Sequence, residues 1–196
     1  MDFKNSVSVT GFVTSEGGGG FVCAVGRTYV DRRSRTVAEL SRIRVVTATG
    51  APTDVRRGSY VSVRGRLYPS PSGSEDFLVR AHSIRVNRGA EVRLRADADL
   101  CGYIAALDIR SVGSRIKAEL RLATREPGSD GKAETTVHSV CAWVGKGVLR
   151  PSELRKGLFV RVTGSLSGRL DYGRDFEPVI LDEVVASKIE SERGRL

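Results

Sequence analysis

Apolar and polar residues alternate along most of the chain, and this alternation predicts short β-strands rather than helices. In the first half, the alternating runs cover residues 6–14, 21–29, 41–49, 60–67 and 77–86. Glycine- and proline-rich segments separate several of these runs, as turns between strands do. A polar, arginine-rich segment at residues 31–40 is predicted to be a loop. The pattern predicts five mostly antiparallel strands that form a small barrel.

One motif occurs twice in the chain. Residues 56–67 and 155–166 share a basic pair, a glycine, an alternating strand, a second glycine, one further residue and a leucine. The offset between equivalent positions is 99 throughout, as it is for Gly58 and Gly157, Gly65 and Gly164, and Phe77 and Phe176. A repeat at this spacing is too long for a solenoid and indicates two copies of one small domain.

The repeat therefore divides the chain into two domains. We expect a first domain at residues 1–88, a linker at 89–98, a second domain at 99–187 and a charged tail at 188–196. Each domain would hold about 90 residues, which can support a modest hydrophobic core. The predicted fold class is all-β, with two tandem five-stranded Greek-key barrels.

The formal net charge of +9 is divided unequally between the two halves. Residues 1–96 contain 16 Lys and Arg against 8 Asp and Glu, whereas residues 97–196 contain 16 against 15. Of the basic residues, 26 are Arg and 6 are Lys. Arginine binds phosphate through two hydrogen bonds and stacks on bases, so this bias favours a nucleic-acid binder that uses its first half. Solvated surface charge in an arginine-rich protein is the alternative.

Thiols and imidazoles are few and scattered, at Cys23, Cys101, Cys141, His82 and His138. His138 and Cys141 are three residues apart on a predicted strand, which places them on opposite faces, so we expect no zinc site. An odd and low cysteine count indicates a reducing compartment and buried thiols. No grouping of residues suits catalysis. We therefore expect no cofactor, no metal and no enzymatic activity.

The second half contains six short motifs in a fixed order. They are Leu122–Arg125, Val144–Lys146, Leu154–Gly157, Gly164–Leu166, Arg169–Tyr172 and Glu183–Ala186. In this order they resemble the pattern of the bacterial and mitochondrial single-stranded-DNA-binding protein family. The first half resembles the family less closely, through Val25–Arg27, Arg57–Gly58 and Gly65–Leu67.

The resemblance implies an OB-fold in each half and binding of single-stranded nucleic acid with little sequence preference. DNA is the favoured ligand, with roles in DNA replication and repair, and RNA is the alternative, because the 2′-hydroxyl contact that separates the two leaves no signal in composition. Family members usually gather four OB-folds, so a chain with two is expected to form a homodimer or a hetero-oligomer. Two features depart from the family. The helix between the third and fourth strands is reduced to one turn starting at Pro151 and is missing from the first half, and the acidic-tipped tail that recruits partner enzymes is absent.

Single strands are bound by a basic groove and by aromatic side chains on which bases stack. By the resemblance, stacking positions fall on Tyr172, on its counterpart Tyr68 and on His138. The basic residues predicted to contact the nucleic acid are Arg27, Arg44, Arg64, Arg66, Arg80, Arg121, Arg125, Lys146, Arg161 and Arg169. We expect Tyr60 and Phe159 in the core, and Trp143 in the core or at an interface.

A different function also fits the sequence, namely that of a structural OB-fold subunit which binds proteins in an organellar ribonucleoprotein or RNA-editing assembly. The near-neutral second half and its altered stacking positions favour this alternative. No apolar run approaches the ~20 residues of a membrane span. No secretory signal is visible before the first strand, so we expect a cytoplasmic or nucleoid protein, or a mitochondrial one whose presequence has been removed.

Overall fold

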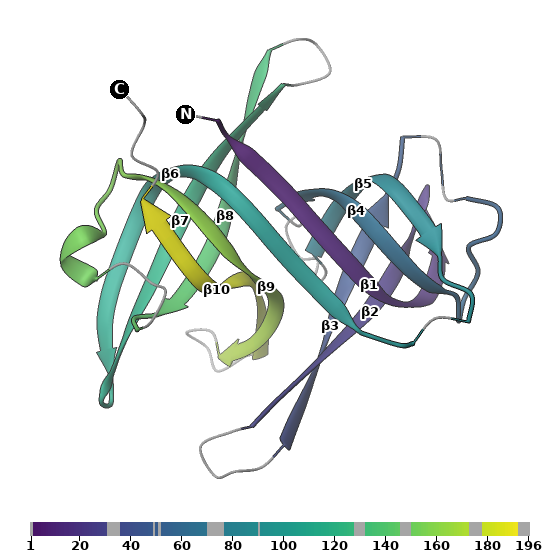
Figure 1. Cartoon of the computed structure of the whole chain (residues 1–196), viewed down its shortest axis with the longest axis horizontal. Coiled ribbons are helices and arrows are strands. Elements are labelled where there is room, and N and C mark those ends of the chain that lie inside the picture. Colours follow the sequence, from purple (N-terminus) through teal and green to yellow (C-terminus); the bar gives the residue numbers. More distant parts are fainter. Residues whose placement is uncertain are drawn as a thin grey trace. The chain divides into compact units, whose positions relative to one another are not determined.

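The computed structural model describes residues 2–30, 36–48, 50, 52–69, 77–89, 91–127, 132–145, 150–172 and 178–191. At residues 27–30, 36–40, 151, 169–172 and 178–182, the description is limited to the backbone. The elements, shown in Figure 1, are β1 (Lys4–Gly17), β2 (Gly20–Val30), β3 (Thr36–Val46), β4 (Tyr60–Tyr68), β5 (Phe77–Val86), β6 (Arg95–Val112), β7 (Arg115–Pro127), β8 (Ala133–Trp143), the 3-10 turn η1 (Pro151–Glu153), β9 (Phe159–Tyr172) and β10 (Pro178–Ser191).

The contacts within the chain define two compact units. Unit 1 comprises Met1–Ser6, Ala98–Ser167 and Glu183–Leu196, and unit 2 comprises Val7–Asp97 and Gly168–Asp182. The largest block of each unit lies close to one of the two domains expected from the repeat. The sequence did not indicate that the first six residues join the second block, or that residues 168–182 join the first.

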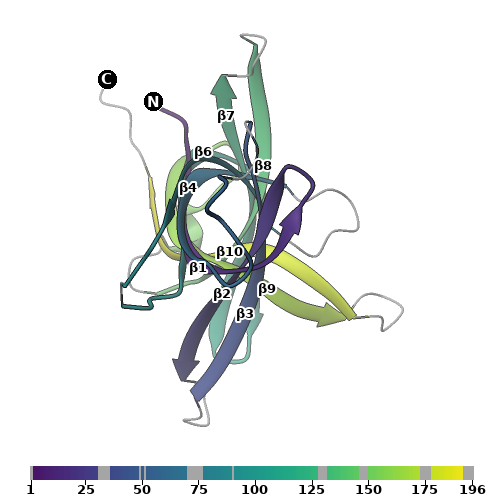
Figure 2. The ribbon, with the colours of Figure 1, turned by 90° about the vertical axis from the view of Figure 1, so that its right-hand side faces the viewer.

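In unit 2, five strands close into a barrel. Their order is β2–β3–β5–β4–β1, and β1 pairs again with β2, which completes the ring (Figure 2). β3 and β5 run parallel, whereas the other pairs of neighbouring strands are antiparallel. Five strands in this Greek-key order form an OB-fold, as the sequence predicted.

Unit 1 repeats the same order with the second set of strands. The ring runs β6–β7–β8–β10–β9 and closes through a pairing of β6 with β9, and β8 and β10 are the parallel pair. The 3-10 turn η1 lies between β8 and β9, where the sequence predicted a single helical turn. Within the described residues, no helix has the length and apolar character needed to cross a membrane.

Alternation along each strand places apolar side chains inside each barrel. Tyr60 and Phe159 are buried, as expected from the sequence. The core of unit 2 includes Val9, Val13, Phe21, Cys23, Val25, Ile43, Val45, Val61, Val63, Leu67, Phe77 and Val79. The core of unit 1 includes Leu100, Ile104, Ala118, Leu120, Leu122, Val140, Ala142, Val160, Val162, Leu166, Val184 and Ile189.

The second glycine of the repeated motif allows two strands to approach closely in each unit. A Cβ atom at Gly164 in β9 would lie 2.9 Å from the Cα of Ala186 in β10. A Cβ atom at Gly65 in β4 would lie 3.0 Å from the Cα of Ala81 in β5. Both hypothetical atoms would also approach a backbone carbonyl more closely than the 3.0 Å that real Cβ atoms keep. The repeat therefore preserves a packing requirement of the barrel.

Several strands are longer than the sequence pattern predicted. β3 begins at Thr36, inside the predicted loop, because its backbone pairs with β2 from Val30 opposite Thr36 onward; Figure 1 shows the two strands continuing as an arm. β6 begins at Arg95, within the predicted linker, and β10 continues to Ser191, within the predicted tail. The rest of the linker is tied to unit 2, since the Arg93 N–H donates to the Tyr60 hydroxyl at 2.6 Å.

Candidate nucleic-acid interface

A row of arginines lies on the outer surface of unit 2, across β3, β5 and β4. In β4, Val63 and Leu67 point into the barrel while Arg64 and Arg66 are exposed. Arg66 lies directly opposite Arg80 of β5 in the antiparallel pairing. Two like charges facing each other across strands destabilise a sheet. A bound polyanion would relieve that repulsion.

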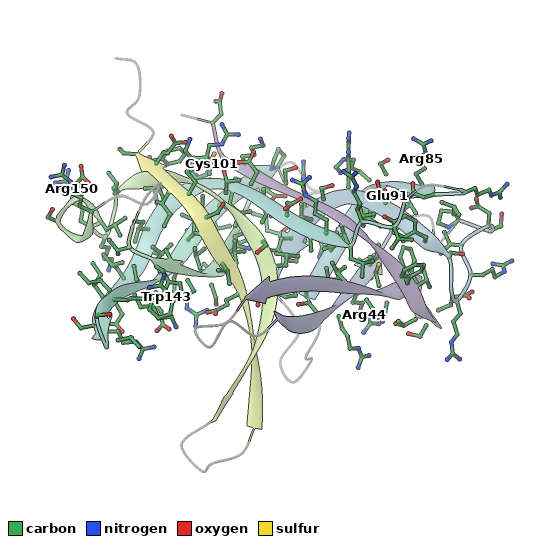
Figure 3. All side chains as sticks on the ribbon, turned by 60° about the horizontal axis from the view of Figure 1, so that its bottom comes forward. Arg44, Arg85, Glu91, Cys101, Trp143 and Arg150 are labelled. Atoms are coloured by element: carbon green, nitrogen blue, oxygen red, sulfur yellow. The ribbon has the colours of Figure 1, made fainter. Side chains whose placement is uncertain are left out.

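Arg44 extends this row onto β3. It is exposed and is paired in register with Leu78 of β5, which in turn lies opposite Tyr68 of β4. Its guanidinium approaches the glycine turn between β1 and β2, where a Cβ on Gly18 would lie 3.1 Å from an Arg44 nitrogen. Figure 3 shows the Arg44 side chain projecting away from the ribbon.

Tyr68 supplies an aromatic ring at the centre of this surface. The Arg80 guanidinium carbon lies 4.0 Å from the centroid of the Tyr68 ring, which is a cation–π contact. Tyr68 is partly exposed. Positive charge and an aromatic ring are therefore combined on this surface, as they are in binding sites for single-stranded nucleic acids.

Three arginines of this surface are distinguished by their charge environment. Among the described residues, Arg44, Arg64 and Arg80 have no carboxylate partner. Of the other residues predicted for this half, Arg27 is described in its backbone alone, within β2. We call the surface formed by Arg44, Arg64, Arg66, Tyr68 and Arg80 the basic face.

In unit 1, several cations are paired with acids. Arg161 donates two hydrogen bonds to Asp99, of 2.9 and 2.7 Å, and Lys4 binds the same carboxylate. The hydrogen bond from Arg161 lowers the pKa of Asp99 below its usual value, with Lys4 contributing in the same direction. Arg161 therefore lies in an ion pair, a role that its sequence position did not indicate.

Glu119 pairs with two further cations of unit 1. Arg110 lies 2.7 Å from its carboxylate, and the buried Lys117 also binds it. Burial acts to raise the pKa of Glu119, but hydrogen bonds from Lys117 and Arg110 outweigh it and lower that pKa. Each of the two carboxylates, Asp99 and Glu119, is therefore bound by two cations, and these four cations are engaged in ion pairs.

His138 does not offer a stacking surface, which corrects the expectation from the sequence. The side chain is 4% exposed, and its Nε2 lies 3.0 Å from the hydroxyl of Thr124. Burial lowers the pKa of His138 to about 4, so the ring is neutral at physiological pH. A base cannot reach this ring in the folded barrel.

The remaining predicted residues of unit 1 differ in how they are placed. Arg121 is exposed and donates a hydrogen bond to the Ser139 hydroxyl, and Arg125 is exposed on the same strand. Lys146 lies outside the described residues. Arg169 and Tyr172 are described in their backbone alone, at the end of β9. Whether these three contact a nucleic acid stays a prediction.

The two halves of the sequence differ strongly in net charge, but the two units of the structure do not. Unit 2 contains 17 Lys and Arg against 12 Asp and Glu, and unit 1 contains 15 against 11. The difference narrows because the acidic segment 168–182 joins unit 2. What distinguishes the basic face is therefore the placement of its arginines and not the net charge of its unit.

Sequence reasoning missed Tyr103 and Val137, which are exposed on the outer surface of unit 1. Trp143 is half-buried, with the Arg115 guanidinium 5.3 Å from its ring centroid. Within the described ranges, no group of His, Cys, Asp and Glu side chains could hold a metal ion. Cys23, Cys101 and Cys141 are buried thiols, and burial raises the pKa of Cys23 to about 12.

No protein-family model matches the sequence, and a search of curated proteins gives no match. Among solved structures, two crystal structures of the single-stranded DNA binding protein from Thermus aquaticus are similar to this chain over its length. The wild-type protein is 23% identical, with a TM-score of 0.67 covering 100% of this chain and 97% of that one. A deletion variant is 22% identical, with a TM-score of 0.69 covering 99% and 97%. This similarity establishes that the two chains share a fold.

Proposed function

We propose that this protein binds single-stranded DNA, without catalysing a reaction, and that the basic face of unit 2 supplies the main contacts. The fold it shares with a single-stranded DNA binding protein supports the ligand class. The observation that carries the proposal is the direct opposition of Arg66 and Arg80, with Arg44 nearby. Arginines gathered in this way on one face of a sheet suit the binding of a polyanion.

Charge would provide most of the affinity. Each arginine that neutralises a phosphate releases a counterion, so binding should weaken as the salt concentration rises. Tyr68, already in contact with Arg80, would offer a ring on which one base stacks. Backbone charge and stacking depend little on base identity, so we expect low sequence specificity.

Two chains are expected to associate, because each one provides two OB units and the family that the sequence resembles usually gathers four. Sedimentation velocity on the free protein tests this expectation. A monomer at all concentrations would contradict it without affecting the binding proposal.

The first experiment titrates the protein with fluorescent oligo-dT and oligo-U of about 30 nucleotides, which is long enough for two OB-folds. We expect tight binding to oligo-dT that weakens steeply between about 50 and 200 mM salt. The ratio of the two affinities measures the preference for DNA over RNA. Absence of binding at low salt would refute the proposal and would favour the alternative role of a structural subunit that binds proteins.

The same titration on a triple variant tests the location of the site. This variant combines Arg44→Gln, Arg66→Gln and Arg80→Gln and so removes three phosphate contacts. Each contact contributes about 0.7 to the slope of the logarithm of the binding constant against the logarithm of the salt concentration, so the slope should fall in magnitude by about 2. The matched control is Arg88→Gln, Arg93→Gln and Arg95→Gln, which removes the same charge from arginines that pair with Asp54, Glu91 and Asp97. An equal loss in both variants would show that binding follows net charge and not the basic face.

A further inference from the structure

Arg80 of β5 and Tyr68 of β4 are neighbours on the outer surface of unit 2. Tyr68 follows the buried Leu67 in β4. Arg80 follows the buried Val79 in β5. Because Leu67 and Val79 are paired across the two strands and point into the barrel, the residues next to them point outward. Tyr68 and Arg80 are therefore diagonal neighbours, at a separation that an aromatic ring and a long side chain can bridge.

The guanidinium of Arg80 covers one face of the Tyr68 ring. Its carbon atom lies 4.0 Å from the ring centroid, a distance at which atoms are in van der Waals contact. A planar guanidinium over a ring is held there by stacking and by cation–π attraction. The tyrosine stays partly exposed, so a ligand can still reach it. Arg80 therefore supports the ring from one side without burying it.

The same arginine remains able to bind an anion. The N–H donors of a guanidinium lie in its plane, whereas the stacking contact uses its face. Arg80 is exposed on β5, and no carboxylate of the described residues pairs with it. A phosphate can therefore bind at the edge of the guanidinium while the face stays on the ring. Lysine could not make both contacts in this way, because its ammonium is a point charge without a plane.

We propose that Arg80 is a positioning residue for Tyr68, which fixes the ring as a platform for one base and binds the phosphate beside that base through its N–H edge. A ring that is fixed before the ligand arrives loses little freedom on binding, which favours stacking. One side chain thereby couples the stacking contact to the charge contact. This inference rests on the proposed function, since it requires the basic face to bind single strands.

The test compares Arg80→Lys with the wild type in the full chain, by titration with oligo-dT and with an abasic strand of the same length. The abasic strand keeps the phosphates and lacks the bases. Arg80→Lys keeps the charge and loses the planar group, so its affinity for oligo-dT should fall about threefold. Its affinity for the abasic strand, and the dependence of binding on salt concentration, should stay as in the wild type.

Arg85→Lys is the matched control for this substitution. Arg85 is also exposed on β5, but it lies outside the basic face and contacts no ring among the described residues. Figure 3 shows its side chain projecting away from the ribbon. Arg85→Lys should bind both strands like the wild type. Urea unfolding of each variant identifies any loss of binding that comes from a damaged fold.

A second variant tests whether Arg80 acts through the ring. Tyr68→Leu removes the platform and should weaken binding to oligo-dT about tenfold. Residues that act through one contact are not additive. Adding Arg80→Lys to Tyr68→Leu should therefore cause no further loss of affinity.

A measurement on the free protein does not depend on any oligonucleotide. Protons of the Arg80 side chain lie over the Tyr68 ring, so the ring current should shift their NMR signals upfield, and Tyr68→Leu should remove that shift. Signals of Arg80 that are the same in the wild type and in Tyr68→Leu would overturn the contact and the inference with it.

Three binding results would also overturn the inference while leaving the proposed function standing. Equal affinities of Arg80→Lys and the wild type for oligo-dT would show that charge alone is needed at this position. An equal loss on oligo-dT and on the abasic strand would show a phosphate contact only. Further weakening of Tyr68→Leu by Arg80→Lys would show that Arg80 does not act through the ring. Failure of the wild type to bind oligo-dT, in contrast, would refute both proposals together.

Discussion

The glycine that ends the repeated motif provides a quantitative test of the barrel geometry. In Gly164→Ala, the new methyl group would lie 2.9 Å from the Cα of Ala186 and closer still to the carbonyl oxygen of Val185. Both obstacles are backbone atoms of β10, so no side-chain rotation can relieve the clash. Overpacking of this kind costs about 1–3 kcal/mol, and alanine recovers about 0.4–1 kcal/mol by restricting the unfolded chain. We therefore expect a net loss of about 1 kcal/mol.

Urea unfolding monitored by circular dichroism measures this loss. For a unit of this size, about 1 kcal/mol corresponds to a shift of about 0.5 M in the urea midpoint. If two transitions are resolved, the transition of unit 1 should move and that of unit 2 should not. Gly145→Ala is the matched control, because a Cβ there would meet no atom within 4 Å. A Gly164→Ala midpoint equal to that of Gly145→Ala would refute the close approach of β9 and β10.

Two further predictions concern charge in unit 1. His138 has a pKa of about 4 in the folded protein, against an ordinary value of 6.5. As the pH falls, the unfolded chain is therefore protonated at this residue before the folded protein is. The free energy of unfolding should be highest above pH 6.5 and should fall by up to about 3 kcal/mol as the pH drops towards 4. His138→Leu should remove this pH dependence, with His82→Leu as the exposed control, and an unchanged profile in His138→Leu would contradict the assignment. For Asp99, whose pKa is lowered by Arg161, Asp99→Asn should reduce stability by about 1 kcal/mol at neutral pH. That deficit should disappear as the pH falls below 3.8 and the wild-type carboxyl is protonated; a constant deficit across pH would show that it arises from packing and not from charge.

The fold could be predicted from the sequence wherever one face of a strand is buried. Alternation with a period of two reports such a face directly, and the repeat showed that the same barrel occurs twice. Prediction from alternation failed where the backbones of two strands continue to pair although the strand has no buried face. β3 starts at Thr36 because its backbone bonds to β2, and hydrogen bonds between backbones impose no pattern on side chains.

The candidate site was less predictable, for two different reasons. For His138, a signal existed, because it alternates in phase with Val140 and Ala142, which are both buried. For Tyr103, none existed, because the ring is positioned by Phe3, about a hundred residues away in the chain. The pairing of Arg161 with Asp99 is likewise a contact between distant segments. Local sequence patterns identify basic residues, but they do not show which of these residues form ion pairs with acidic side chains.

The division of the chain into its two units has a consequence for how it can be dissected. The backbone passes from one unit to the other four times, after Ser6, Asp97, Ser167 and Asp182. No single cleavage can therefore release a complete unit. A fragment ending at residue 97 would carry the Phe3 segment without its packing partners and would lack residues 168–182. Each half of the polypeptide keeps the five strands of one barrel, so a cut after residue 97 separates only the segments 1–6 and 168–182 from the units to which they belong.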